Sequence, residues 1–287
     1  MRDFDWKIIS TLHKYKNITK AANILFIAQP TLTKRIQLIE EELGVSLIVR
    51  TTKGVTLTAE GEYVARKAEQ ILKYIDEIKL NFTNVSGGTV GTLRIGVPNS
   101  YAEFIMPDLL SQFSALYPNI KFDMEIAASN EIIKLVENHE VNVGFARGSY
   151  TTSLEKVLLA DDQVYLVNKE PIELDDLPDL PRIDYAREPS IEQAITTWWN
   201  QRYDRKALVR MQVNHGNTAI AMVKAGLGYA FFSDRNFFKD TPSLYSEPLI
   251  FTDGTYFTRK THLYYTKEET YNQVALNFIN FAKSFDY

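Results

Sequence analysis

A short segment, residues 29–35, concentrates side chains that can hydrogen-bond the edges of DNA bases. It holds the amide of Gln29, the hydroxyls of Thr31 and Thr33, and the cations Lys34 and Arg35. Amides, hydroxyls and guanidinium groups match the donors and acceptors that base pairs present in the major groove. The segment therefore predicts a DNA-reading helix face, and the alternative is a small helical bundle with a solvated polar face.

A second set of polar side chains stands where strands are expected to end and helices to begin. Helix N-termini present free N–H groups that favour anions. Arg147 follows another expected strand and would add a full positive charge. These observations predict a small carboxylate or other anion as ligand, although each residue could instead be an ordinary helix cap. The candidates are Asn99, Ser100, Tyr101, Ser129, Asn130, Arg147, Asn217 and Thr218.

The first set must lie on a helix whose other side is buried. Pro30 suits the first turn of that helix, and Gly44 suits its C-terminal stop. An apolar face is predicted from residues that recur at spacings of 4, 3 and 4, namely Leu32, Ile36, Ile39 and Leu43. We expect this helix to follow a helix over residues 4–15 and a short helix that Thr19 caps, and Thr19 is also a candidate DNA contact. Segments 46–50 and 55–58 then predict a hairpin with Lys53 at its cationic tip.

The next segment predicts one long helix over residues 59–82. Its apolar residues follow an a/d heptad pattern for nearly three heptads: Val64, Ala68, Ile71, Ile75, Ile78 and Phe82. Such a seam needs a partner helix, and the simplest partner is a second copy of the chain. The alternative is packing against the body of the same chain. Residues 86–89, Ser-Gly-Gly-Thr, would end the helix as a joint.

From residue 92 onward, strand and helix patterns alternate in two successive β-α-β rounds. This alternation predicts an α/β domain of two lobes. Open α/β sheets bind ligands at the carboxyl ends of their strands, and a cleft between lobes is a natural site. We therefore expect a DNA-binding domain at 1–58, a linker helix and joint at 59–88, and a ligand-binding domain at 89–287.

The composition is that of a globular protein with an unevenly distributed charge. Residues 1–58 carry nine Lys or Arg and five Asp or Glu, whereas the remainder carries 23 and 31. A basic N-terminal segment on an acidic chain suggests a polyanionic partner for that segment. With no cysteine, no secretory pattern at the N-terminus and no apolar run of 18 residues, we expect a cytoplasmic protein without a membrane segment.

The residues of the N-terminal segment also carry a family resemblance. The matching positions are Ala21-Ala22, Leu25, Gln29 to Thr33, Ile36, Glu40 to Val45, Leu47, Arg50-Thr51, Gly54-Val55, Leu57-Thr58 and Gly61. Together they resemble the winged helix-turn-helix of LysR-type transcription regulators. The resemblance implies DNA contacts from Gln29, Pro30, Thr31, Thr33, Lys34 and Arg35, and wing contacts from Arg50, Thr51 and Lys53. Ala28 departs from the family's usual Ser, and Ile48 departs from its usual Phe.

The remainder more loosely resembles the family's regulatory domain, which has the fold of type 2 periplasmic solute-binding proteins. The supporting residues are Gly91 to Gly96, Pro107, Leu110, Phe113, Tyr117-Pro118, Val223 and Ala225 to Gly228. The resemblance places lobe I at 90–160 and 268–287, and lobe II at 161–267. It also implies that the linker helix forms a dimer, and it favours tetramers over dimers. Each dimer would bind two half-sites of double-stranded DNA.

Two other function classes remain as alternatives, a cytosolic solute-binding protein and an enzyme on the same scaffold. The sequence has no Gly-Xaa-Ser-Xaa-Gly elbow, no phosphate loop and no clustered His, Asp and Glu set. His13, His139, His215 and His262 are scattered, so neither a metal site nor a cofactor is expected. The sequence therefore favours a regulator that is not an enzyme.

Overall fold

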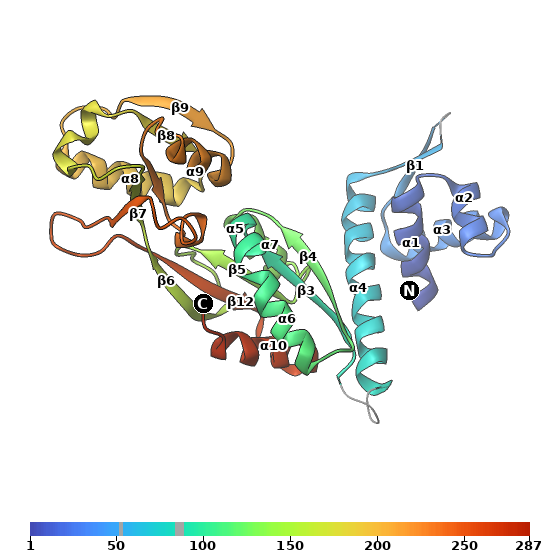
Figure 1. The fold of residues 1–287 in the computed structure, drawn as a ribbon. Helices are drawn as coiled ribbons and strands as arrows, with labels where there is room; N and C mark the ends of the chain where they lie inside the picture. Colours follow the sequence, from blue (N-terminus) through green and yellow to red (C-terminus); the bar gives the residue numbers. More distant parts are fainter. Residues whose placement is uncertain (52–53, 84–88) are drawn as a thin grey trace. The chain divides into compact units, whose positions relative to one another are not determined.

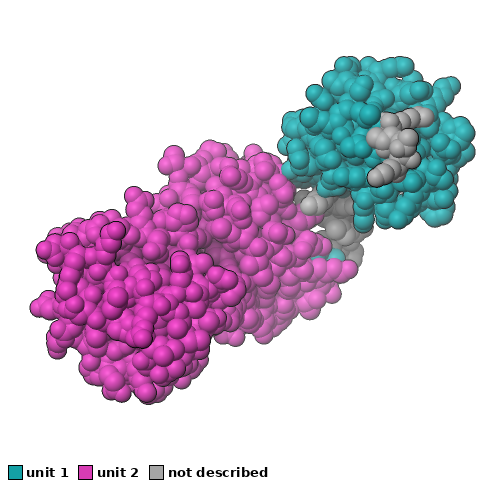
Figure 2. Space-filling model, turned by 90° about the horizontal axis from the view of Figure 1, so that it is seen from above, with its two compact units in different colours: residues 1–91 teal, residues 92–287 magenta. Residues whose placement is uncertain are grey.

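The computed structural model of the protein describes residues 1–51, 54–83 and 89–287. The chain forms two compact units, Met1–Gly91 and Thr92–Tyr287, which Figure 2 colours separately. We call the first the head and the second the body. The long helix that the sequence assigned to a separate linker belongs to the head unit. Among the described residues, no helix is both long enough and apolar enough to cross a membrane.

The head begins with three helices that share one apolar core (Figure 1). They are α1 (Asp3–Tyr15), α2 (Ile18–Ile24) and α3 (Gln29–Leu43). Ala21 and Ala22 of α2 are buried, and such small side chains let the neighbouring helices approach closely. The side chain of Asn17 accepts a hydrogen bond from the backbone N–H of Lys20 and so caps α2. The expected cap at Thr19 is therefore wrong, because Asn17, two residues earlier, occupies the capping position.

The helix α3 has the apolar face that its periodicity predicts. Leu32, Ile36 and Ile39 are buried against the other helices, whereas Leu43 in the last turn is 37% exposed. Within the described residues, the capping position of α3 provides no side-chain hydrogen bond, because Ala28 occupies it. At the other end, Gly44 adopts a φ of +70°, a left-handed conformation that a residue with a Cβ adopts only at a cost.

The expected hairpin follows α3. Strands β1 (Ile48–Thr51) and β2 (Gly54–Leu57) pair antiparallel, with Ile48 opposite Leu57 and Thr51 opposite Gly54. Leu57 and the nearby Leu47 are buried against the helices of the head. The core therefore fixes the base of this hairpin, and the buried Val55 of β2 donates its N–H to the carbonyl oxygen of Lys16 at 3.1 Å.

The N-terminal half of the long helix α4 (Ala59–Thr83) packs against the apolar core of the head. Ala65 and Ala68 are fully buried, and Val64 packs partly against the same core. Ala68 therefore belongs to the head core and not to a dimer seam, whereas Val64, which is only half-buried, stays a predicted seam residue. Farther along, Ile78 is 55% exposed, so the unpartnered part of the stripe lies in the C-terminal half of α4. The side chain of Phe82 lies outside the described residues.

Lobe I of the body is built on one five-stranded sheet. Its elements are β3 (Gly91–Val97), α5 (Asn99–Phe104), α6 (Met106–Leu116), β4 (Ile120–Ile126), α7 (Ser129–Glu137), β5 (Val143–Arg147), β6 (Glu155–Gln163), β12 (Thr258–Tyr265), a 3-10 turn (Lys267–Tyr271) and α10 (Gln273–Ser284). The strand order is β4-β3-β5-β12-β6, with β3 parallel to β5 and β12 antiparallel to both of its neighbours.

Both faces of this sheet are covered. Phe113 of α6 and Phe278 of α10 pack with the strand residues Leu93 and Ile95 in one core. The helix α7 covers the other face, where a Cβ on Gly144 would lie 2.6 Å from a methyl group of Ile132. The close approach of α7 to β5 therefore depends on a glycine.

Lobe II lies within residues 164–257. Its elements are β7 (Tyr165–Asn168), a 3-10 turn (Leu174–Asp179), β8 (Arg182–Tyr185), α8 (Pro189–Arg202), β9 (Val209–Val213), α9 (Gly216–Lys224), β10 (Ala230–Phe232), a 3-10 turn (Arg235–Phe237) and β11 (Tyr245–Pro248). One sheet has the order β10-β7-β11, and β8 pairs parallel with β9. A hydrogen bond of 2.8 Å from the N–H of Ile183 to the carbonyl oxygen of Tyr229 links the two sheets.

The chain crosses between the lobes twice, at 163–164 and at 257–258. Figure 1 shows β6 and β12 as long strands that run from the lobe I sheet toward lobe II. They pair along their whole length, from Thr258 opposite Gln163 to Tyr265 opposite Glu155. The predicted return at residue 267 is therefore wrong by about ten residues. Local sequence pattern does not show that β12 pairs with β6, so the sequence could not assign β12 to lobe I.

Candidate functional site

The exposed side of α3 presents most of the polar side chains expected there. Gln29, Pro30, Thr31 and Lys34 are exposed, and Thr33 is half-buried. Thr19 on α2 is exposed as well. Because the apolar residues of α3 face the core, a row of an amide, hydroxyls and an ammonium group faces solvent. This composition can hydrogen-bond both base edges and phosphates.

Arg35 differs from the expectation. Its guanidinium donates two hydrogen bonds to the carboxylate of Asp5 on α1, from Nε at 2.6 Å and from Nη2 at 2.7 Å. Asp5 is fully buried and also accepts a hydrogen bond of 2.6 Å from the backbone N–H of Arg2. Arg35 is therefore a bridge between two helices of the head and not a free cation. The sequence feature that could have predicted this pair is Asp5, an acidic residue on the apolar side of α1.

The electrostatics of this pair follow from its geometry. Burial by itself would raise the pKa of Asp5, but the hydrogen bonds from Arg35 and from the Arg2 N–H outweigh it and lower the pKa.

Two of the expected wing residues, Arg50 and Thr51, lie on β1 of the hairpin. The side chains of those two residues, and the whole of Lys53, lie outside the described residues.

A cleft of about 500 Å³ opens between the two lobes of the body. A volume of this size suits a small-molecule ligand. Of the eight residues that the sequence nominated, Asn99, Ser100 and Arg147 line the cleft. Tyr101, Ser129, Asn130, Asn217 and Thr218 are not among its lining residues.

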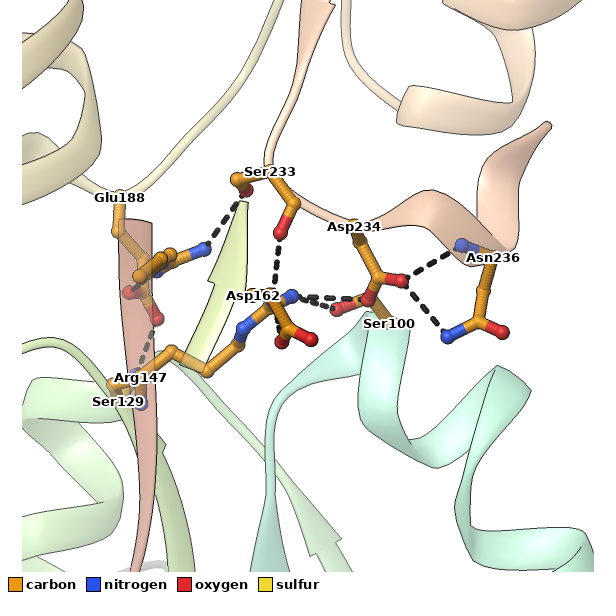
Figure 3. A network of polar contacts seen from close by, with 9 residues as sticks. Ser100, Ser129, Arg147, Asp162, Glu188, Ser233, Asp234 and Asn236 are labelled. Atoms are coloured by element: carbon orange, nitrogen blue, oxygen red, sulfur yellow. Dashed lines mark hydrogen bonds and ion pairs between the residues drawn. The ribbon is translucent and has the colours of Figure 1, made fainter. Parts of the chain in front are cut away.

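Arg147 joins the two lobes at the cleft (Figure 3). Its guanidinium is buried and donates to Asp162 at 2.9 Å and Ser100 at 3.3 Å on the lobe I side. On the lobe II side it donates to the carboxylate of Asp234 at 3.0 Å and to the carbonyl oxygen of Ser233 at 2.5 Å. The carboxylates of Asp162 and Asp234 thus pair with the guanidinium of Arg147, which the sequence had predicted to bind a ligand.

Tyr101 turns away from the cleft. Its ring is buried under the guanidinium of Arg147, at 5.7 Å, and lies against Tyr287, with the ring centroids 6.2 Å apart. Burial raises the pKa of its hydroxyl. Of these two neighbouring residues of α5, Ser100 therefore lines the cleft and Tyr101 packs in the core of lobe I.

The remaining nominated residues lie outside the cleft lining, and the hydroxyl oxygen of Ser129 accepts a hydrogen bond of 3.0 Å from the backbone N–H of Arg147. Asn130 is exposed beyond the cleft. The side-chain amide of Asn217 donates to Glu103 of α5 at 2.6 Å, which makes it an interlobe contact. Thr218 lies within α9 because that helix begins at Gly216, so residues 214–216 line the cleft in place of 217 and 218.

Sequence reasoning missed two cleft arginines, Arg187 and Arg259. Arg187 stacks on the ring of Tyr185 at 3.9 Å and donates to the carbonyl oxygen of Phe231 at 2.9 Å. Arg259 forms an ion pair with Glu188, and its burial, together with the nearby Arg147, lowers its pKa to about 10. Arg187 lies between the end of β8 and the start of α8, so the strand-to-helix pattern could have identified it, whereas Arg259 lies within β12, where that pattern does not apply.

The charges around the cleft point to its chemistry. Three guanidinium groups and one carboxylate, that of Glu188, are among its lining residues. In the described residues, the buried Nε atoms of Arg187 and Arg259 have no hydrogen-bond partner. Unsatisfied buried donors beside cations favour an acceptor-rich, negatively charged ligand.

Comparisons with known proteins agree with this architecture. A family model described as bacterial regulatory helix-turn-helix protein, LysR family, matches residues 5–62. A second, described as LysR substrate binding domain, matches residues 86–285. The HTH-type transcriptional regulator YraN of Bacillus subtilis (strain 168) is 32% identical over 283 residues, which cover 99% of this chain and 98% of YraN.

Solved structures share the fold over nearly the whole chain. Full-length CbnR complexed with its target DNA is 19% identical with a TM-score of 0.70, and the match covers 99% of each chain. Full-length BenM is 21% identical with a TM-score of 0.54, covering 98% of this chain and 96% of BenM. The two family models together with the match to YraN are decisive, and the chain belongs to the LysR family of bacterial helix-turn-helix regulatory proteins.

Proposed function

We propose that this protein is a transcription regulator whose head binds double-stranded DNA through α3 and the β1–β2 hairpin. The exposed polar row from Gln29 to Lys34 on α3 is the single observation that carries the proposal. Gln29 and Thr31 at the start of α3 would read base edges, as the N-terminal residues of recognition helices do. Lys34 would contact phosphate. CbnR, which shares the fold, was crystallised with its target DNA.

A small anionic effector in the interlobe cleft would modulate this binding. The arginines and unsatisfied Nε atoms around the cleft support an anion, and Asn99 and Ser100 at the start of α5 would add polar contacts. A ligand regulates only if it binds two arrangements of the protein with different affinity. Because the cleft lies between the lobes, lobe closure is the rearrangement that an effector would control.

The functional assembly would be a homo-oligomer, a dimer or a tetramer. The exposed Ile78 on α4 supports pairing of two α4 helices, since an apolar seam in water is covered in a stable assembly. Two heads in one dimer would engage two half-sites and multiply the affinity of each. The effector would then act on the spacing of the heads and on the bend of the bound DNA.

The experiment has two stages. DNA sequences that bind the full chain are selected from a random duplex library and footprinted. Small anionic metabolites are then screened by the thermal shift of the full chain, because a ligand that binds only the folded state raises its stability. We expect the best stabiliser to change the footprint or the bend. An absence of sequence preference would exclude the DNA-binding proposal, and an unchanged footprint and bend would exclude the effector mechanism.

A further inference from the structure

A carboxylate of the protein already crosses the interlobe cleft. Glu188 precedes α8 in lobe II, and its Oε1 accepts a hydrogen bond of 2.8 Å from the backbone N–H of Ser129 in lobe I. Ser129 is the first residue of α7. The other oxygen of Glu188 accepts from Nη2 of Arg259, at the start of β12. Figure 3 shows Glu188 reaching to Ser129 beside the Arg147 network.

In the described part of the chain, the residue at the capping position of α7 makes no side-chain hydrogen bond to the helix. Ala128 occupies the capping position and offers no side-chain acceptor. The only side-chain acceptor recorded for the N–H of Ser129, among the residues that the structure describes, comes from Glu188 in the other lobe. A carboxylate at such an end gains both a hydrogen bond and the favourable field of the helix dipole. Glu188 therefore occupies a position that suits an anion.

Arg259 depends on the same carboxylate. In the described part of the chain, the ion pair of Arg259 is with Glu188, whereas Arg147 pairs with two carboxylates and Arg187 contacts two more. The side chain of Arg259 is only 11% exposed. Removing one partner of a buried pair leaves the other charge uncompensated, which is strongly unfavourable. If Glu188 leaves, Arg259 therefore requires another anion.

We propose that Glu188 is a built-in surrogate for the carboxylate of the effector, and that the effector binds by displacing it from Ser129 and Arg259. The inference rests on the proposed anionic effector. Exchange of one carboxylate for another keeps Arg259 paired and the α7 N-terminus capped. It breaks the Glu188–Ser129 contact between the lobes, so effector binding and release of an interlobe bond become one event.

The exchange sets the class of the effector. A neutral molecule cannot replace the charge on Arg259, so the ligand must carry a carboxylate or an equivalent anion. The surrogate also competes with the effector, because binding must first displace Glu188. Affinity for simple carboxylates is therefore weak in the natural chain and increases when Glu188 is removed.

The test is chemical rescue in the full chain. Glu188→Ala removes the atoms that acetate contains, so sodium acetate is the probe, with sodium chloride matched for ionic strength. We expect acetate to raise the melting temperature of Glu188→Ala in a saturable manner, with binding at least about tenfold tighter than to the natural chain. Asp179→Ala is the matched control, because Asp179 pairs with Arg205 on the exposed surface. That variant should respond to acetate as the natural chain does.

A second pair of variants keeps the proposal testable if Glu188→Ala folds poorly. Glu188→Gln retains an acceptor for the Ser129 N–H but leaves Arg259 unpaired, so it should also bind acetate more tightly than the natural chain. Adding Arg259→Gln to either variant should abolish the gain. Equal acetate responses in the variants and the natural chain, or rescue that persists without Arg259, would overturn the surrogate role. An effector-dependent footprint of the natural chain would in that case still stand, so the two proposals fail separately.

Discussion

The guanidinium of Arg35 on α3 and the carboxylate of Asp5 on α1 form a two-point ion pair inside the head. The pair holds α3, the helix that we propose reads DNA, against α1. A residue that the family resemblance assigns to DNA is thus tied to the orientation of α3. This separates side chains that would contact DNA directly from one that sets the angle at which they do so.

Loss of Asp5 should destabilise the head. Asp5→Asn removes the charge, weakens both bonds from Arg35 and leaves guanidinium donors without their partner. We expect a loss of about 1–3 kcal/mol in the free energy of unfolding, the usual cost of an unsatisfied buried group. Urea denaturation followed by circular dichroism measures it. Asp3→Asn, on an exposed residue of the same helix, is the control, and equal losses in both variants would contradict the assignment.

The same pair predicts an acid sensitivity of the head. The pKa of Asp5 lies below its ordinary value of 3.8 in the folded chain. A depressed folded-state pKa contributes stability that is complete above pH 3.8 and is lost as the pH falls below it. Denaturation of the natural chain and of Asp5→Asn at pH 6 and pH 3 should therefore show a smaller difference between the two proteins at pH 3. A constant difference would be inconsistent with the ionised pair.

Gln29 and Lys34 should affect DNA binding in different ways. Gln29→Ala removes a base-edge contact and should reduce binding to the selected site by about 1–3 kcal/mol, with a small effect on unrelated sequences. Lys34→Ala should weaken binding to all sequences and reduce the slope of log K against log salt by about one. Gel shifts at several salt concentrations measure both effects. Lys206→Ala, an exposed lysine of the body, should change neither, and an identical response of all three variants would refute the assigned helix face.

The C-terminal half of α4 should carry the pairing of subunits. Ile78→Glu places a charge on an apolar side chain that is 55% exposed in the single chain, and it should halve the mass seen by sedimentation without loss of helix content. Ala68→Glu should instead unfold the head, because Ala68 is fully buried in it. An unaltered sedimentation mass for Ile78→Glu would place the interface elsewhere.

Arg147 should stabilise the body as a whole. Arg147→Lys keeps the charge but cannot reach Asp162, Ser233 and Asp234 at once, because an ammonium group lacks the planar fork of guanidinium. We expect a loss of about 3 kcal/mol, as for a broken buried pair. Differential scanning calorimetry of the full chain measures it. Arg205→Lys, in an exposed pair with Asp179, should leave the melting temperature unchanged, and a similar result for Arg147→Lys would show that the network is not a lobe bridge.

The sequence by itself determined the elements of the head and the fold class. The apolar residues of α3 recur with helical spacing, and Gly44 ends the helix where its φ is positive. The hairpin over residues 48–57 also follows from local pattern. These features depend on residues close together in the chain, where spacing alone decides which side chains share a face.

The tertiary structure alone decided which polar groups meet. Arg35 and Asp5 are 30 residues apart, Glu188 and Ser129 are 59 apart, and Glu188 and Arg259 are 71 apart. The assignment of β12 to lobe I likewise depends on its pairing with β5 and β6. Periodicity identifies the buried side of an element but not the neighbour that covers it. The partners of a buried charge are fixed only when the elements pack, because only then does desolvation require each charge to be paired.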